Sequence, residues 1–342
     1  MLQNKTKITI YDVAELAGVA ISTVSRVINN SSDVSESTRA KVKEALQTLH
    51  FRPHRIAKAL AQKQGDSIAI AIPSFTTPFH NELLKGIRSY LRDFDEIDML
   101  LFDLGSNKIH TKLLNFLKRG AVDGLLLSGV PINDMVAQEL LSLRSPVVLT
   151  GANYEAFDSF YWDDTAGARD AVVHLIRQGH RRIGMIRAHT VSDLQSKRVM
   201  GYRSALEEAG LPFDASLLSS GTTVKHAGFS EEAGYEAMQA LLAQDTPPTA
   251  VFCSSDVQAL GAWKAILDAD LKVPDDIALV GYDDIKSSAF FGLTSVDQSM
   301  QEIGRRAIEL LLQRMSGEVD EPPSSVLVTP NLQIRRSSLK TR

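Results

Sequence analysis

ITIYDVAELAGVAISTVSRVINN, residues 8–30, is the stretch that decides how this chain begins to fold. Thr9 is followed three residues later by Asp12, which is the spacing of a capping box, and apolar residues then recur at helical intervals. Gly18 interrupts this pattern, and a second short helix is expected over residues 21–28. Two short helices joined by a turn that contains glycine predict a helix-turn-helix.

The second of these helices is expected to have two different faces. Val24, Val27 and Ile28 form its apolar side. The other side carries mainly small and polar residues, namely Ile21, Ser22, Ser25, Arg26 and Asn29. Small side chains let a helix enter the major groove of DNA, where an arginine can form two hydrogen bonds with a guanine. The alternative is a surface helical hairpin in which Arg26 is a solvated charge.

The composition is that of a globular protein with an uneven distribution of charge. The 342 residues are 44% hydrophobic, which is enough for a small DNA-binding module and a large core. The net charge of −4 separates into +5 for residues 1–64 and −9 for the remainder, as expected for a basic headpiece on an acidic body. With no long apolar run and no apolar secretory region, neither a membrane contact nor export is expected. The single cysteine, Cys253, excludes an internal disulfide and fits the cytoplasm.

Three sequence blocks near the start of the chain resemble one known family. VAELAGVAISTVSRVINN, VSESTRAKV and HFRPHRIAKALA resemble, in sequence and spacing, the N-terminal region of the lactose/galactose repressor (LacI/GalR) family. The resemblance covers residues 7–338 and is weaker over residues 67–160. It implies a homodimer that binds a pseudo-palindromic operator in double-stranded DNA. Leucine heptads, with which some relatives form tetramers, do not occur in this sequence, so a dimer is the expected assembly.

A third helix and a hinge are expected after the helix-turn-helix. Ser35 is a suitable N-cap for a helix over residues 35–49, and Pro53 then interrupts the chain. The resemblance implies that RIAKALA, residues 55–61, is a hinge helix that becomes ordered when two copies meet on DNA. It also implies that Leu60 wedges into the minor groove and bends the duplex. The alternative is that Leu60 packs against the body.

Both the headpiece and the hinge are expected to contact DNA. The headpiece residues expected to do so are Thr9, Tyr11, Ile21, Ser22, Thr23, Ser25, Arg26, Asn29, Ser35 and Thr38. The hinge residues are His54, Ala57 and Leu60. His54 stands where relatives often carry Asn or Ser, so the resemblance is weakest at this contact.

From Ser67 onward, strands and helices alternate. SIAIAI, residues 67–72, is a nearly continuous apolar run, typical of a buried parallel strand. The elements expected next are a loop at 73–79, a helix at 81–94, a strand at 98–103, a helix at 111–119, a strand in GLLLSG and, after another helix, a strand at 146–150. After about residue 165, strands are expected at 182–186, 249–254 and 277–282, and helices at 166–178, 198–209, 231–243 and 257–268. This alternation predicts two doubly wound parallel sheets in tandem.

The last segment completes the expected architecture. TSVDQSMQEIGRRAIELLLQR reads as a strand and a helix, and PPSSVLVTPNLQIRRSS reads as paired strands. The resemblance implies an all-α helix-turn-helix headpiece and an α/β body similar to periplasmic sugar-binding proteins, with three crossings between two discontinuous lobes. The expected domains are a helix-turn-helix domain at 1–52, a hinge helix and linker at 53–65, and an effector-binding and dimerisation domain at 66–342. Its lobe 1 comprises residues 66–164 and 297–328, and its lobe 2 residues 165–296 and 329–338.

Ligands bind open α/β sheets at the carboxyl ends of the strands, so the cleft between the lobes is the expected effector site. The candidate ligand residues are Ser74, Phe79, Asp163, Arg198, Phe229, Ser255, Asp256 and Asp283. Asp283 in GYDD and Arg198 in RVMGY match family positions that often bind ligand oxygens. Their opposite charges are expected to pair with each other when no ligand is bound. Carboxylate, guanidinium and aromatic groups together suit a polyhydroxylated ligand.

These candidates also have structural interpretations. Aspartates that follow strands often cap helices, which applies to Asp163, Asp164 and Asp256. Arg198 could simply bridge to a carboxylate, and both phenylalanines could belong to the core. Gly151 and Ala152 stand where relatives often have a polar or acidic ligand contact, so the resemblance does not identify the ligand.

The sequence therefore predicts a repressor whose operator affinity changes when a small sugar-like effector alters the angle between the lobes. The alternative within this class is a corepressor-type regulator that responds to a purine or a phosphosugar. A sugar-binding transport protein would need an export signal and no headpiece. No enzymatic activity and no cofactor is expected, because motifs for nucleotides and nucleophiles are absent. His50 and His54 are four residues apart without a further ligand nearby, so no metal site is expected.

Overall fold

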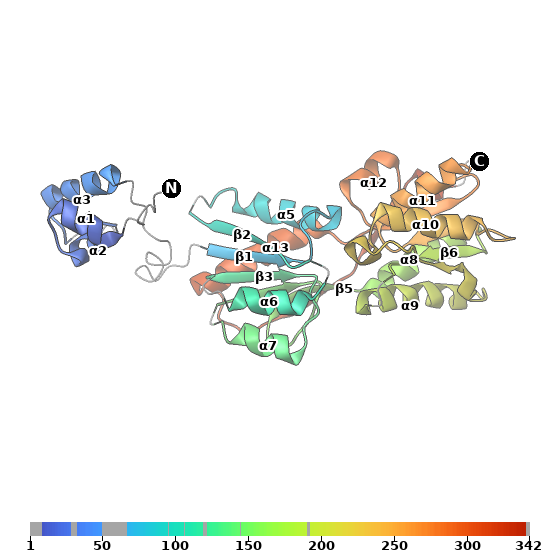
Figure 1. Ribbon diagram of the computed structural model, residues 1–342. Helices are drawn as coiled ribbons and strands as arrows, with labels where there is room; N and C mark the ends of the chain where they lie inside the picture. Colours follow the sequence, from blue (N-terminus) through green and yellow to red (C-terminus); the bar gives the residue numbers. More distant parts are fainter. Residues whose placement is uncertain are drawn as a thin grey trace. The chain divides into compact units, whose positions relative to one another are not determined.

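The chain consists of two compact units, Met1–Asp66 and Ser67–Arg342. The computed structural model describes residues 9–28, 33–49, 67–94, 96–105, 107–118, 122–143, 145–189 and 192–339 (Figure 1). The hinge, residues 55–61, and the expected DNA contacts Asn29, His54, Ala57 and Leu60 lie outside the described residues. No helix in the described parts of the chain is long and apolar enough to cross a membrane.

Within the described residues of the first unit, three helices form a small bundle. They are α1 (Ile10–Ala17), α2 (Ile21–Ile28) and α3 (Glu36–Thr48). The capping box is present, because the carboxylate of Asp12 accepts hydrogen bonds from the backbone N–H of Thr9 at 2.6 Å and from its hydroxyl at 2.7 Å. Gly18 ends α1 in the left-handed conformation, with φ of 64°, which is favourable for glycine. Buried valines from all three helices form the core, so the helix-turn-helix prediction is confirmed.

Lobe 1 of the second unit contains a six-stranded parallel sheet in the order β11-β5-β4-β3-β1-β2. Its strands are β1 (Ser67–Ile72), β2 (Asp98–Asp103), β3 (Gly124–Ser128), β4 (Val147–Thr150), β5 (Asp158–Trp162) and β11 (Ser325–Val328). Its helices are α5 (Pro78–Leu91), α6 (Ile109–Leu117), α7 (Asp134–Leu141) and α13 (Met300–Ser316). In β1 the isoleucines face α5 and α13, whereas Ala69 and Ala71 face the opposite side, so both faces of the sheet are buried.

Lobe 2 contains a second six-stranded sheet, in the order β12-β10-β9-β8-β6-β7, in which β12 alone is antiparallel to its neighbour. Its strands are β6 (Ile183–Ile186), β7 (Leu218–Ser219), β8 (Ala250–Cys253), β9 (Ala278–Asp283), β10 (Thr294–Asp297) and β12 (Asn331–Gln333). Its helices are α8 (Asp164–Arg177), α9 (Asp193–Glu208), α10 (Glu231–Leu242), α11 (Asp256–Asp268) and α12 (Lys286–Phe291). Short 3-10 helices lie at η1 (Ala215–Leu217), η2 (Lys225–Gly228) and η3 (Arg336–Ser338). Two apolar clusters cover its two faces, one with α8 and α9 and the other with α10 and α11.

Glycines allow pairs of helices in both lobes to pack backbone against backbone. A Cβ atom on Gly86 of α5 would lie 1.9 Å from the carbonyl oxygen of Gln301 in α13. A Cβ on Gly304 of α13 would lie 2.3 Å from the carbonyl oxygen of Leu83. Glycines of α9, α10 and α11 make equally close approaches in lobe 2. Since no larger side chain fits where these helices touch, each pair of helices is held at a fixed separation.

The chain crosses between the lobes three times, from β5 to α8, from β10 to α13 and from β11 to β12. Only one or two residues separate the elements at each crossing: β5 and β10 lead into helices, and β11 leads into strand β12. The carboxyl ends of the two sheets therefore approach each other at these crossings, which is where ligands bind in open α/β sheets.

The structure differs from the sequence-based expectations in several elements. The loop expected at 73–79 ends earlier, because α5 begins at Pro78, a residue well suited to the first turn of a helix. Helix α9 begins at Asp193, five residues before the expected start, with Ser192 as its N-cap. The two final strands do not pair with each other, because β11 joins β5 in lobe 1 and β12 joins β10 in lobe 2. The paired-strand prediction for the end of the chain was therefore wrong.

Candidate functional site

Helix α2 of the headpiece presents the side chains that were expected to read DNA. Val24 and Val27 are buried, whereas Ser22 and Arg26 are exposed and Ile21 is 40% exposed. No carboxylate of the described headpiece residues forms an ion pair with Arg26. The guanidinium is therefore available for a base or a phosphate.

The other expected headpiece contacts are divided between exposed and capping residues. Tyr11 is 67% exposed, and Thr23 and Ser25 are partly buried. Ser35 caps α3, because its Oγ accepts from the backbone N–H of Thr38 at 3.3 Å and its hydroxyl donates to Thr38 Oγ1 at 2.9 Å. The described surface thus combines α2 with the N-terminal ends of α1 and α3, which is suitable for phosphate contacts beside a recognition helix.

Arg198 lies fully inside lobe 2, on α9, with its positive charge already balanced. Its Nε donates to Asp164 Oδ1 at 2.9 Å, its Nη2 is 2.9 Å from the same oxygen, and its Nη1 donates to the carbonyl oxygen of Ser254. The guanidinium carbon also lies 3.6 Å from the centre of the Tyr282 ring. The expected pairing of Arg198 with Asp283 was wrong, because the guanidinium pairs with Asp164 of α8 instead. The interpretation of Arg198 as a bridge to a carboxylate is thus confirmed in part.

Asp283 ends β9 and has no cation paired with it among the described residues. It is 9% exposed and accepts a hydrogen bond of 2.8 Å from Nε2 of Gln298. Its φ of 112° is strained for a non-glycine residue, which is common at ligand sites. Burial raises the pKa of Asp283 well above its usual range; Arg198 opposes this shift, whereas the nearby carboxylates of Asp256 and Asp164 add to it. The site therefore has more carboxylates than cations.

Asp256 is the acceptor at the centre of a buried hydrogen-bond network that stabilises the fold. Its carboxylate accepts from the backbone N–H of Ile285 at 2.9 Å and from the hydroxyls of Ser288 and Ser295, each at 2.6 Å. Burial raises its pKa to about 7, although the two serine hydroxyls oppose the shift. Ser255, and not Asp256, caps α11. This network fixes the segment after Asp283, so Asp256 contributes to the site mainly by positioning.

The remaining candidates are placed at or near the expected strand ends. Asp163 caps α8, accepting from the N–H of Ala166 at 2.9 Å, as the capping interpretation predicts. Ser74 follows β1 and its hydroxyl interacts with that of Thr76 at 2.9 Å. Phe79 is partly buried in the first turn of α5, and Phe229 is partly buried after η2. Their roles toward a ligand stay predictions.

A continuous chain of contacts links the carboxyl ends of the two sheets. The ring of Phe79 lies at 6.3 Å from that of Trp162, and Trp162 Nε1 donates to the carbonyl oxygen of Gln298 at 2.8 Å. Gln298 in turn donates to Asp283. Side chains from lobe 1, a crossing segment and lobe 2 thus meet at one place.

Three polar atoms of lobe 1 and of the segment after β10 are buried without a hydrogen-bond partner among the described residues, in addition to the Tyr282 hydroxyl and Nε of Arg187 in lobe 2. The three atoms are His80 Nε2, Thr150 Oγ1 and Gln298 Oε1. Thr150 is the last residue of β4, and His80 follows Phe79 in α5. A buried polar atom without a partner is uncommon and costs about 1–3 kcal/mol, so these three atoms mark a place where a polar ligand would fit.

Sequence reasoning missed His80, Thr150 and Gln298. Thr150 directly precedes Gly151, where the resemblance lacked a polar contact, so its hydroxyl at a strand end was the available signal. His80 and Gln298 had no such signal, since their importance depends on which atoms remain unpaired after folding. No cluster of three metal-binding side chains occurs in the described regions of the chain.

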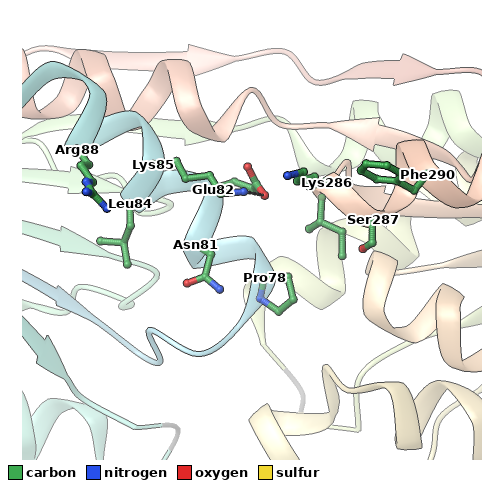
Figure 2. A pocket seen from close by; sticks show the side chains of 10 residues that line it. Pro78, Asn81, Glu82, Leu84, Lys85, Arg88, Lys286, Ser287 and Phe290 are labelled. Atoms are coloured by element: carbon green, nitrogen blue, oxygen red, sulfur yellow. Dashed lines mark hydrogen bonds and ion pairs between the residues drawn. The ribbon is translucent and has the colours of Figure 1, made fainter. Parts of the chain in front are cut away.

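A separate cavity of about 610 Å³ lies beside this site, between α5 and α12. Figure 2 shows Asn81, Glu82 and Lys85 on one side of it, with Lys286 and Phe290 on the other. None of the candidate ligand residues lines this cavity. Glu82 is already paired with Lys85 at 2.6 Å and accepts from Gln301 at 2.8 Å. The candidate ligand residues and the unpaired buried atoms therefore lie outside the lining of this cavity.

Comparisons with known proteins agree with this architecture. The profile of "Bacterial regulatory proteins, lacI family" matches residues 9–54, and that of "Periplasmic binding protein-like domain" matches residues 172–338. Catabolite control protein A of Priestia megaterium is 33% identical over 340 residues, which are 97% of this chain and 99% of that protein. This chain belongs to the LacI family. It is a DNA-binding transcriptional regulator with a small-molecule effector domain, and it is not an enzyme.

Solved structures of LacI-family regulators have the same fold. The Lac repressor dimer bound to operator and the anti-inducer ONPF aligns with a TM-score of 0.75 at 28% identity, covering 98% of this chain and all of that chain. The regulator CelR in complex with cellobiose aligns with a TM-score of 0.69 at 32% identity, covering 97% of this chain and all of that chain. The expectation of a headpiece and two parallel-sheet lobes is thereby confirmed.

Proposed function

We propose that this LacI-family regulator is a repressor whose affinity for a pseudo-palindromic operator is set by a sugar-like effector held where the two lobes meet. The observation that supports this proposal is the set of unpaired buried atoms on His80, Thr150 and Gln298, beside the carboxylate of Asp283. Hydroxyl groups of a sugar would satisfy these atoms, and an aromatic ring such as that of Phe79 would cover its apolar face.

An effector at this position would act on the angle between the lobes. It would touch lobe 1 through His80 and Thr150, and lobe 2 through Asp283, with Gln298 in the crossing between them. Binding would favour the interlobe angle at which all these contacts form together. A ligand that couples two sites in this way changes operator affinity by about 5–150-fold, which corresponds to 1–3 kcal/mol.

The test is an operator titration. The operator is first selected from random duplexes with the full chain, and its dissociation constant is measured by fluorescence anisotropy with and without each of a set of metabolites. Release of the operator would identify an inducer, and tighter binding would identify a corepressor, the alternative within this class. If compounds that bind the protein leave operator affinity unchanged, the proposal is contradicted.

We also propose that the regulator acts as a homodimer and that β2 lies in the dimer interface. Strand β2 is the edge of the lobe 1 sheet, and Met99, Leu100 and Leu101 are consecutive residues with 37%, 45% and 43% exposure. An exposed apolar edge strand promotes aggregation unless something covers it. A second copy is the expected cover, since a twofold symmetric protein reads a pseudo-palindromic site. Because its target is DNA, the expected location of the regulator is the cytoplasm.

A further inference from the structure

His80 places an imidazole in the proposed effector site, and one of its two nitrogens has no hydrogen-bond partner among the described residues. The side chain is only 8% exposed, and its Nδ1 is 2.6 Å from Oγ1 of Thr77. Its Nε2 is buried without a partner and faces Gly129, the residue after β3. A Cβ atom on Gly129 would lie 3.4 Å from Nε2, which is van der Waals contact, so the backbone of Gly129 closes this side of the ring.

The hydrogen bonds around Thr77 bear on which nitrogen of this imidazole carries the proton. The Thr77 hydroxyl has one proton, and it has two possible acceptors, the carbonyl oxygen of Ser74 at 3.3 Å and Nδ1 of His80 at 2.6 Å. Donation to Ser74 leaves the ring hydrogen on Nδ1 and makes Nε2 an acceptor, whereas donation to Nδ1 makes Nε2 a donor. We adopt the first arrangement. Burial lowers the pKa of His80 to about 4; Asp103 opposes this shift, and His226 of lobe 2 adds to it. The ring is thus neutral at pH 7.

The other unpaired groups of the site are also mainly acceptors. Oε1 of Gln298 is an acceptor without a partner among the described residues, and Nε2 of the same amide donates one of its two hydrogens to Asp283. The Thr150 hydroxyl can donate or accept. Arg198 is not a free donor toward an anion, because all three of its nitrogens contact Asp164 or the Ser254 carbonyl. Nε2 of His80, Oε1 of Gln298 and the carboxylate of Asp283 are thus the acceptors of this group, whereas the Tyr282 hydroxyl and Nε of Arg187, which are also buried without a partner in the described parts of the chain, are donors near the ends of β9 and β6.

We propose that His80 determines the chemical class of the effector: Nε2 accepts a hydrogen bond from an effector hydroxyl or N–H group, and the site takes neutral, donor-rich molecules and rejects their phosphorylated counterparts. This inference rests on the proposed function and narrows it. A phosphate would face the lone pair of His80, the amide oxygen of Gln298 and the carboxylate of Asp283. Burying a charge among such groups without a counter-ion is strongly unfavourable.

The first experiment compares matched pairs of compounds on the full chain. The pairs are ribose and ribose 5-phosphate, glucose and glucose 6-phosphate, cellobiose and cellobiose 6′-phosphate, and inosine and inosine monophosphate. Binding is measured by calorimetry and by the rise in the thermal midpoint. The neutral member of a pair should bind, and its phosphorylated partner should bind at least about 10-fold more weakly. A phosphorylated member that binds as tightly as its neutral partner would overturn the inference.

The second experiment uses variants of His80 with the compound that binds. His80→Phe keeps a planar ring but removes the acceptor, and the affinity should fall about 10-fold or more because a buried donor of the ligand loses its partner. His80→Gln restores an amide oxygen and should recover a substantial part of this loss. His110→Phe is the matched control, because His110 lies in lobe 1 with its Nε2 already bonded to the Pro131 carbonyl at 2.7 Å.

The outcomes separate this inference from the proposed function. Equal affinity of wild type and His80→Phe, with both variants folded as shown by their thermal midpoints, would overturn the role of His80 even if the compound still changes operator affinity. A neutral compound that depends on His80 for binding but leaves operator affinity unchanged would support the inference and contradict the proposed function.

Discussion

The guanidinium of Arg198 pairs with the carboxylate of Asp164, 2.9 Å away, although Asp283 lies in the same buried region. Arg198 is 2% exposed and Asp164 is 6% exposed, so the two charges are desolvated together. This pair joins α9 to α8 and leaves Asp283 as the carboxylate that has no cation of its own. The three charged residues therefore have different roles, and substitutions at each should have different effects.

Arg198→Ala should destabilise the whole second unit. It would leave Asp164 buried without its partner, at a cost of about 3–5 kcal/mol in the free energy of unfolding. Urea unfolding of the full chain, followed by circular dichroism, measures this loss. The paired variant Arg198→Met with Asp164→Leu should recover most of it, because apolar side chains can replace a buried ion pair. Wild-type stability of Arg198→Ala would show that the ion pair does not stabilise the fold.

Asp283→Asn should remove the effector response without affecting the fold. The amide oxygen can still accept from Gln298, but the negative charge and one acceptor are lost. Effector affinity should fall about 10-fold or more, while operator affinity without effector stays within a factor of about two. Operator titrations with and without effector measure both quantities. An unchanged response would exclude Asp283 from the effector site.

Arg26→Ala should reduce specific DNA binding more than nonspecific binding. An exposed arginine on the recognition helix that contacts a guanine contributes about 1–3 kcal/mol to discrimination. Gel-shift titrations on the selected operator and on a random duplex at the same salt concentration measure the two affinities. Equal losses on both duplexes would mean that Arg26 contacts a phosphate.

Leu100→Lys in β2 should shift the protein from dimer to monomer and weaken operator binding. A lysine on an exposed edge strand carries charge into any interface formed there. Leu327→Lys is the matched control, because Leu327 is 51% exposed on β11, the opposite edge of the same sheet. Sedimentation velocity at micromolar concentration measures the assembly. If the Leu100→Lys variant remains a dimer, the interface lies elsewhere.

His80 should make the protein less stable as the pH falls from 6.5 toward 4. In this window the unfolded chain binds a proton that the folded His80, with its pKa lowered to about 4 by burial, does not bind. The contribution of His80 to the free energy of unfolding is thus largest above pH 6.5. At pH 5 this contribution is smaller by about 2 kcal/mol. Asp256 has the opposite effect, because its raised pKa makes the folded state bind a proton more readily as the pH falls below 7.

The comparison of wild type with His80→Phe isolates this contribution. Urea unfolding at pH 7 and pH 5 should show a smaller loss of stability for the variant than for the wild type, while Asp256 contributes equally to both. An identical loss in both proteins would mean that His80 is protonated in the folded state as readily as in the unfolded chain.

Much of the fold could be predicted because buried parallel strands are marked by apolar runs. The bounds of β1 and β2 agree with the expected ranges, and so do those of α2. Strand β5 was missed, since it begins with a charged residue, Asp158, which is 3% exposed. Arg314 of α13 makes its burial possible through hydrogen bonds of 2.8 and 3.1 Å. No local pattern shows that an arginine more than 150 residues away will balance this charge.

The site was predictable in location but not in its internal pairing. The rule that ligands bind at the carboxyl ends of parallel strands predicted that Arg198 and Asp283 lie in one region, and they do. The choice of Asp164 as the partner of Arg198 depends on how closely α8 and α9 pack, and a Cβ on Gly201 would lie only 2.2 Å from the carbonyl oxygen of Thr165. Such packing, and the unpaired Nε2 of His80 that results from folding, cannot be read from spacing alone.

The close approach of α5 and α13 at Gly86 and Gly304 also bears on how a signal can travel through the body. Helices in backbone contact cannot slide past each other without steric overlap, so lobe 1 should respond to a load as one stiff element. Most of the bending of the body should then occur in the short segments that connect the two lobes. Strain produced by a bound effector would not be dissipated within a lobe, and the whole displacement would reach Ser67, from which the chain leads to the DNA-binding headpiece.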